Sequence, residues 1–159
     1  MKIGSLASVC LALATVSLGG CSSESAPTEQ APEGIPGVKI SNARLVLPAV
    51  AGNPGAVYFD IQNDGDDFAT IRAVDVKGAK SAMMHETKDE GGKSTMADLN
   101  TLNIMKGKPE KFEPGGKHVM AMELDPALKA GDSTEVTLTF VGGDKMSFPA
   151  TIEAAGGKE

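Results

Sequence analysis

The sequence has few of the residues that usually build large cores and catalytic sites. Its 159 residues include no Trp, one Tyr, five Phe, two Cys and two His. We therefore expect an aliphatic core. The chain also lacks a Gly-x-Ser-x-Gly nucleophile elbow, and its few cysteines and histidines offer little for nucleophilic catalysis. These absences predict a protein that is not an enzyme.

Positive charge is also scarce. The chain has 15 Lys and Arg against 21 Asp and Glu, a formal net charge of −6. Nucleic-acid-binding proteins need a basic face, and a polybasic membrane contact needs clustered Lys and Arg. We therefore expect neither a nucleic-acid partner nor an electrostatic membrane contact.

The longest apolar run lies at the N-terminus and has the pattern of a lipoprotein signal. Lys2 precedes an apolar stretch over residues 3–18, which is short for a membrane span. Leu18-Gly19-Gly20-Cys21 resembles the bacterial lipobox, whose cysteine is acylated and becomes the first mature residue. We expect residues 1–20 to be removed and Cys21 to carry the lipid. The alternative is an ordinary secretory signal with an incidental cysteine.

Such processing would leave the folded part of the chain without a free thiol. Cys10 lies in the removed segment, and Cys21 would be lipidated. Thiol ligands are at risk of disulfide formation in the oxidising compartments outside the cytoplasm. A soft-metal site in this domain must therefore use other ligands, and a blue-copper electron-transfer site, which needs a thiolate, is disfavoured.

The rest of the chain divides into a tether, one domain and a short tail. Residues 21–36 are rich in Ser, Ala, Pro and Glu, which predicts a disordered tether. Residues 37–155 are expected to form one β domain, and residues 156–159 a flexible tail. Short apolar runs predict about eight strands, at residues 38–47, 56–62, 69–76, 81–87, 94–99, 117–124, 134–141 and 145–152. Gly-, Pro- and Asn-containing turns separate them, which favours an antiparallel β-sandwich or Greek-key barrel.

Methionine is the residue type in excess. Seven of the eight methionines lie in the second half of the chain, and both histidines, His85 and His118, lie among them. A methionine taken alone is most simply a flexible filler of an irregular core. The spacing favours a site instead, because His118, Met120 and Met122 would share one face of a strand. If residues 81–87 and 94–99 form a hairpin centred between Glu90 and Gly91, His85 and Met96 lie directly opposite each other.

Two imidazoles and two thioethers favour one metal ion. Thioethers are soft neutral ligands that suit Cu(I), whereas Zn(II) is normally held by thiolate, imidazole or carboxylate. We therefore predict one Cu(I) per chain, bound by His85, Met96, His118 and Met120. Met83 and Met122 share faces with these residues and are either accessory ligands or an apolar wall. Met84 faces the other side and is expected in the core, and Met105 and Met146 are expected to fill core or surface positions.

At these residues the sequence resembles the periplasmic copper chaperone family called PCu(A)C. The resemblance rests on a spacing of ten residues between His85 and Met96 and twenty-one between Met96 and His118, followed by Val119-Met120. It extends to the Ala56-Val57-Tyr58-Phe59-Asp60-Ile61-Gln62-Asn63 segment and to Pro114-Gly115-Gly116 before His118. The matching segments span residues 38 to 153.

This resemblance implies a cupredoxin-like β-sandwich that carries Cu(I) in the periplasm with the four ligands named above. It also implies delivery of copper to the binuclear copper centre of a haem-copper oxidase, alongside a Sco-type thiol protein. The C-terminal residues 153–159 contain no His or Met, so the second copper site of some family members is not expected. Two alternatives stay open: a copper storage or resistance lipoprotein, and a structural lipoprotein with an incidental Met-rich core.

Overall fold

The computed structural model describes residues 34–156. The expected signal peptide over residues 1–20, the lipidated Cys21 and most of the tether lie outside the described residues, as do the last three residues of the tail. The described part of the chain begins just before the expected domain start at residue 37.

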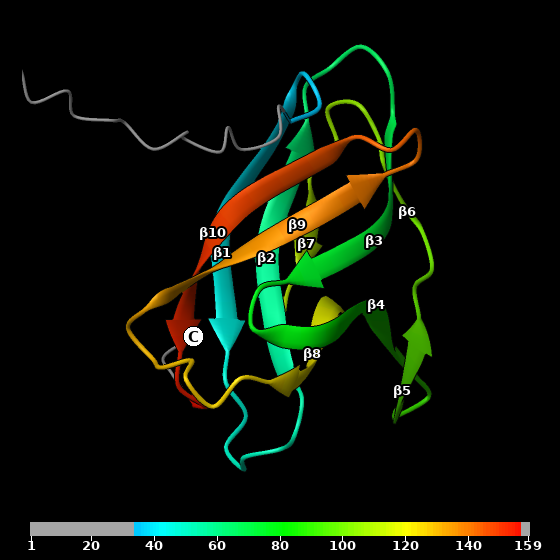
Figure 1. Ribbon diagram of the computed structural model, residues 1–159. Coiled ribbons are helices and arrows are strands. Elements are labelled where there is room, and N and C mark those ends of the chain that lie inside the picture. Colours follow the sequence, from blue (N-terminus) through cyan, green and yellow to red (C-terminus); the bar gives the residue numbers. More distant parts are fainter. Residues whose placement is uncertain (1–33, 157–159) are drawn as a thin grey trace, which may run out of the picture.

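Ten strands make up the described chain, and Figure 1 shows their arrangement. Their bounds are β1 Val38–Val46, β2 Gly55–Asn63, β3 Ala69–Val76, β4 Ala79–Glu90, β5 Lys93–Asp98, β6 Leu102–Ile104, β7 Glu110–Phe112, β8 Lys117–Leu124, β9 Ser133–Phe140 and β10 Lys145–Glu153. The strands are joined in the order β5-β4-β8-β7-β2-β1-β10-β9-β3-β6. Most neighbours are antiparallel, but β1 pairs with β10, and β7 with β8, in parallel.

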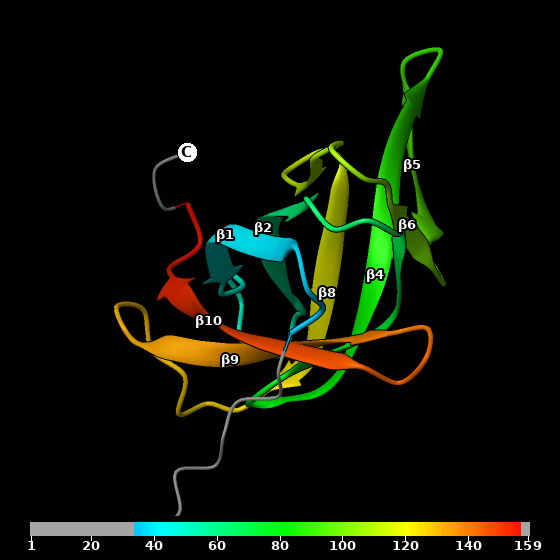
Figure 2. The same ribbon diagram turned by 90° about the horizontal axis from the view of Figure 1, so that it is seen from above.

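This continuous sheet folds over so that its two halves face each other. β4, β8, β2 and β1 belong to one half, and β10, β9 and β3 to the other. β9 and β10 run diagonally in front of β1 and β2 in Figure 1 and lie along one side of them in Figure 2. Phe59 of β2 stacks on Phe112 of β7 with ring centroids 4.2 Å apart. The same ring lies 5.3 Å from Phe148 of β10, so aromatic packing joins the two halves.

Side-chain alternation explains why these segments form sandwich strands. Along β2 every second residue is buried, and the inward set includes Val57, Phe59 and Ile61. Leu138 and Phe140 of β9 are equally buried in the opposing half. Burial of these side chains is the main stabilising term, at roughly 1.5–3 kcal/mol for each large apolar group. As expected from the composition, the core is mostly aliphatic with a few Phe.

The all-β class predicted from the sequence is confirmed, with differences in detail. All eight predicted strands are present, and their bounds agree within a few residues. The three-residue strands β6 and β7 were not predicted, because such short segments show no alternation of their own. Within residues 34–156, no helix is long and apolar enough to cross a membrane.

Candidate metal centre

The two faces of β4 carry different residues. Met84 points into the core and is 4% exposed, in agreement with the sequence prediction. Its neighbours Met83 and His85 point to the opposite, outer face, because successive side chains alternate along a strand. On β8 the same alternation turns Val119 inward and leaves His118 and Met120 on the outer face. The outer face of β4 and β8 therefore carries both histidines and several of the methionines.

The register between β4 and β8 places these residues in opposite pairs. The outer-face pairs are Ser81 with Met122, Met83 with Met120 and His85 with His118. Opposite Cβ atoms in an antiparallel pair are roughly 5 Å apart, and successive pairs on one face are roughly 7 Å apart. The histidine pair therefore lies next to the Met83–Met120 pair, with Met122 one step beyond.

The two imidazole rings lie nearly parallel. Their centroids are 5.9 Å apart and their planes are inclined by 21°. Both residues are buried, at 7% and 8% exposed, although they face away from the core. Burial of a polar ring is costly unless its nitrogens find partners, so the partners of each nitrogen matter.

Each ring has one nitrogen placed beside an oxygen. Nδ1 of His118 lies 3.0 Å from the carbonyl oxygen of Gly116. A carbonyl can only accept a hydrogen bond, so Nδ1 carries the proton and Nε2 keeps a free lone pair. Nδ1 of His85 lies 3.4 Å from the carboxylate of Asp98, which favours the same tautomer. Metal-binding histidines are commonly oriented through the non-ligating nitrogen in this way.

The other nitrogen of His85 has no partner. Its Nε2 is buried and makes no hydrogen bond to any described residue. A buried unsatisfied nitrogen costs about 1–3 kcal/mol, which a metal bond to its lone pair would offset. The residues present therefore fit a metal ion held by imidazole nitrogen on this face.

The β4–β5 hairpin corrects one expectation about Met96. The structure pairs Glu90 with Lys93, so the turn is Gly91-Gly92 and Met96 lies opposite Thr87 rather than His85. Both glycines have positive φ, 61° and 79°, which suits a two-residue hairpin turn and fixes this register. The shift is two residues, so Met96 stays on the same face as His85 and lies diagonal to it.

The remaining methionines divide between the outer face and the rest of the molecule. Met83 is 44% exposed and Met96 55% exposed, while Met120 and Met122 are partly exposed. Met146 packs against the core, and Met105 is exposed on a loop, as the sequence allowed for both. Met83, Met120 and Met122 therefore lie together beside the histidines.

Asp98 and the Gly116 carbonyl were not predicted, although Asp98 follows Met96 on the same face.

An ionic cluster lies next to the site on the inner face of the same strands. The Lys117 ammonium is 3.0 Å from Glu110 and 3.6 Å from Glu86, and Lys88 is 3.1 Å from Glu86. Partial burial acts to lower the pKa of Lys117, but bonding to Glu110 and Glu86 outweighs it and raises this pKa. The hydrogen bond from Lys88 holds the pKa of Glu86 below its ordinary value. These ion pairs join the first residue of β8, next to His118, to β4 and β7.

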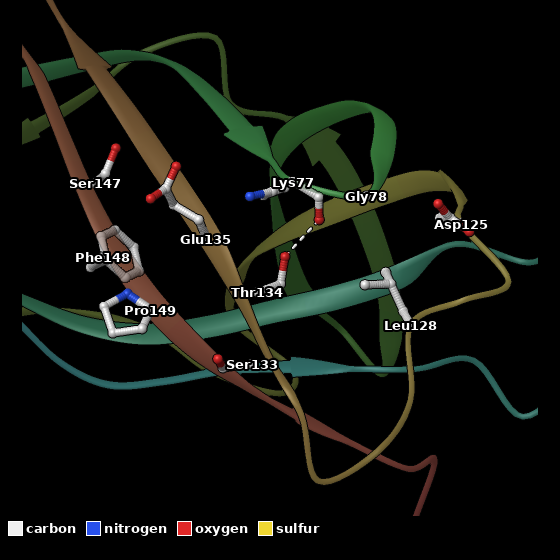
Figure 3. Close-up of a pocket in the computed structure, with 10 residues that line it drawn as sticks. All are labelled: Lys77, Gly78, Asp125, Leu128, Ser133, Thr134, Glu135, Ser147, Phe148 and Pro149. Carbon is white, nitrogen blue, oxygen red and sulfur yellow. Dashed lines mark hydrogen bonds between the residues drawn. The ribbon is translucent and has the colours of Figure 1, made fainter. Parts of the chain in front are cut away.

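Of two hollows on the surface, only the smaller one borders the outer face of β4 and β8. A groove of about 570 Å³, drawn in Figure 3, is lined by the β3–β4 turn, the segment between β8 and β9, and strands β9 and β10, including Lys77, Leu128 and Phe148. Its lining contains no His or Met. A smaller cavity of about 170 Å³ borders the candidate centre and is lined in part by Met83, Asp98 and Arg72. Among residues 34–156, no group of three or more His, Cys, Asp or Glu is placed to hold a metal ion.

Comparisons with known proteins show what this domain resembles. The family model described as "Putative lipoprotein LpqE-like" matches residues 38–152. The chain is 30% identical over 138 residues to "Putative lipoprotein Lxx21020" of Leifsonia xyli subsp. xyli, covering 86% of this chain and 82% of that protein.

Solved structures of similar fold include two that contain copper. The copper-bound PCuAC domain from PmoF2 matches with a TM-score of 0.63 and 19% identity, covering 77% of this chain and 97% of that domain. The solution structure of CuI-DR1885 from Deinococcus radiodurans matches with a TM-score of 0.61 and 25% identity, covering 79% of this chain and 81% of that one. These likenesses confirm the cupredoxin-like fold that the sequence resemblance implied. The chain belongs to the LpqE-like lipoprotein family, and its domain has the PCuAC fold.

Proposed function

We propose that this domain binds one Cu(I) ion outside the cytoplasm and delivers it to a copper enzyme. Its ligands are Nε2 of His85, Nε2 of His118 and the thioether sulfurs of Met96 and Met120. All four ligands are neutral, so the charge of the monovalent ion stays uncancelled in the first shell, which suits a bound but exchangeable ion. Copper is therefore the cargo of the domain rather than a cofactor for catalysis.

The observation that carries this proposal is the pair of oriented histidines beside thioethers. Nδ1 of each ring faces an oxygen, which leaves both Nε2 atoms as lone-pair donors, and that of His85 is buried with no partner. Met120 is two residues from His118 on the same face, and Met96 lies diagonal to His85. Mixed imidazole and thioether donors favour Cu(I) over Zn(II) or Mg(II).

The similar structures support the same ion. One is a copper-bound PCuAC domain and another is the Cu(I) form of DR1885, and both share this fold. The four-ligand spacing that resembles the PCu(A)C family lies entirely within residues 38–152, the segment matched by the LpqE-like family. A copper-delivery role is thus supported by both the donor set and the fold.

The cellular setting follows from the N-terminal pattern. Lipid on Cys21 would anchor the domain to a membrane of the cell envelope, with residues 22–36 as a tether, in the periplasm or its equivalent. The acceptor we propose is the binuclear copper centre of a haem-copper oxidase subunit, with a Sco-type thiol protein as a second component. Because the chain is acidic, we expect no nucleic-acid partner.

The competing functions differ in observable ways. A structural lipoprotein with an incidental Met-rich core is disfavoured because Met83 and Met96 are exposed on the outer face, where they fill no core gap. A copper storage or resistance protein would use the same site but would retain its ion when an acceptor is present. A measurement of copper transfer to an acceptor, rather than of copper binding, therefore distinguishes a delivery protein from a storage protein.

The first experiment measures binding on the full-length chain carrying Cys10→Ser and Cys21→Ser, so that no thiol competes for Cu(I). Anaerobic titration should give one Cu(I) per chain, and X-ray absorption should show both nitrogen and sulfur neighbours. His118→Ala should weaken binding by about 2–4 kcal/mol, because one of four ligands is lost. A first shell without sulfur, or unchanged affinity in His118→Ala, would remove the proposed site.

The second experiment measures transfer. The Cu(I)-loaded chain is mixed with an apo copper-domain fragment of a haem-copper oxidase, and the two proteins are separated and assayed for copper. Delivery predicts that copper moves to the oxidase fragment. Retention by the loaded chain would favour storage.

A further inference from the structure

Three thioethers lie next to one another beyond the histidine pair. Met83 and Met120 are directly opposite across β4 and β8, and Met122 is the next outer-face residue of β8. Met122 lies across from Ser81, whose small side chain leaves space over that position. The three residues therefore form a triangle on the outer face, which we name the thioether triad.

The exposure of the triad does not fit a packing role. Met83 is 44% exposed, and Met120 and Met122 are partly exposed, whereas Met84 on the inner face of the same strand is 4% exposed. Methionine fills gaps well when buried, but a row of partly exposed methionines leaves apolar surface in contact with water. Another contribution must offset this cost.

The spacing of the triad suits coordination of a soft ion. The Cβ atoms of an opposite pair are roughly 5 Å apart, and residues two apart on one strand are roughly 7 Å apart. Each sulfur is carried on flexible torsions beyond its Cβ, so the three sulfurs can converge on one ion without moving the backbone. Three neutral thioethers favour Cu(I) or Ag(I) and exclude hard divalent ions.

We propose that Met83, Met120 and Met122 form a second, all-thioether site through which Cu(I) passes between solvent and the histidine pair. Met120 belongs to both sites, so the ion can move without leaving the protein. Bonds from the ion to Met83 and Met122 form as those to His85, His118 and Met96 break. The ion stays monovalent, and no electron or proton is transferred.

The location of the triad fits such a transit role. Nε2 of His85 is buried, so an ion cannot bind it straight from solvent. Met83 is the most exposed member of the triad and also borders the small cavity lined by Arg72 and Asp98. The triad therefore lies between open solvent and the buried nitrogen of His85.

This inference rests on the proposed function for the identity of the ion, and the test separates the two. The chain has only two histidines, so His85→Ala/His118→Ala in the thiol-free full-length chain removes all imidazole. We expect this variant to keep one Ag(I) site of lower affinity. Carbon-13-labelled methionine methyl resonances of Met83, Met120 and Met122 should shift with Ag(I), while those of Met105 and Met146 should not.

Matched leucine variants test the assignment in the same background. Met83→Leu/Met122→Leu should lower the residual Ag(I) affinity by about tenfold or more, since two of three ligands are lost. Met105→Leu is the control and should leave it unchanged, because Met105 is an exposed loop residue outside both proposed sites. Equal affinity in all three chains, or no shift of the triad methyl groups, would overturn the transit site while leaving the histidine site untouched.

A second measurement covers the case in which the double alanine variant does not fold. In the chain that keeps both histidines, Met83→Leu/Met122→Leu should slow release of Cu(I) to a chelator by about fivefold or more. Its equilibrium affinity for one ion should stay within about twofold, since the four proposed ligands remain. An unchanged release rate would overturn the proposal. Loss of Cu(I) binding by the unmodified thiol-free chain would instead contradict the proposed function.

Discussion

The carboxylate of Asp98 lies 3.4 Å from Nδ1 of His85, while the other nitrogen of that ring is buried without a partner. Asp98 is the residue directly opposite His85 in the β4–β5 ladder, so the hairpin register creates this contact. The carbonyl oxygen of Gly116, in the segment before β8, lies beside Nδ1 of His118 in the same way. Both rings are therefore oriented through Nδ1, which leaves the lone pair of each Nε2 free of these contacts.

Replacing Asp98 by Asn should weaken Cu(I) binding without removing the site. The ligands remain, but the group that holds the proton on Nδ1 of His85 loses its charge. Loss of such an orienting partner typically costs 10–100-fold in metal affinity. Chelator competition measures the effect. Asp89→Asn, on the same face nearer the hairpin tip, is the control, and equal affinities in the two variants would contradict the orienting role.

Met96→Leu should reduce Cu(I) affinity by about tenfold or more and leave the fold unchanged. Met96 is 55% exposed, so the substitution should change the free energy of unfolding by less than about 0.5 kcal/mol. Met105 is similarly exposed, at 50%, but lies on a loop away from the histidines. Met105→Leu should therefore bind Cu(I) like the unmodified chain. If the two variants bind alike, Met96 is not a ligand.

Two adjacent methionines should differ sharply in their effect on stability. Met84→Ala creates a cavity in the core and should lower the free energy of unfolding by about 2–5 kcal/mol. Met83→Ala removes an exposed side chain and should change it by about 0.5 kcal/mol or less. Urea denaturation of the metal-free protein gives both values, and similar losses would mean that the outer and inner faces of β4 are wrongly assigned.

Glu86→Gln should reduce the loss of stability in acid. The pKa of Glu86 is lowered from its ordinary value of 4.5, first by the hydrogen bond from Lys88. A carboxylate with a lowered folded-state pKa stabilises the fold above its unfolded pKa, and this contribution is lost as pH falls through the folded-state value. The unfolding free energy should thus fall less steeply below about pH 5 in Glu86→Gln. Glu90→Gln, exposed on the same strand, should follow the unmodified chain.

Much of the fold could be predicted because its signals are local. Alternation of apolar and polar residues marked eight strands, and Gly- and Pro-containing segments marked the turns between them. Strands β6 and β7 could not be predicted, because a run of three residues is too short to show alternation of apolar and polar side chains. Their pairing with β3, β2 and β8 comes from tertiary contacts that no window of sequence contains.

The sequence allowed the residues on the shared outer face to be predicted, but not how they pair across the strands. Spacing placed His118 and Met120 on one face, and the structure agrees. The pairing of His85 with His118 was not foreseen, since it depends on a register set between strands 33 residues apart. The His85–Met96 register was wrong because the turn was placed one residue too early, although the Gly91-Gly92 pair is itself a strong two-residue turn signal.

Strand β5 is exposed along its whole length, pairs only with β4, and projects from the body of the domain in Figure 2. Opening such an edge strand costs far less free energy than opening a core strand, so we expect β5 to open before the rest of the domain. Each such opening would withdraw Met96 and Asp98 together, so the proposed site would lose one sulfur and one orienting carboxylate. The apparent affinity for copper is then scaled by the fraction of time the hairpin is closed. Opening of this hairpin would thus weaken the hold on copper without unfolding the rest of the domain.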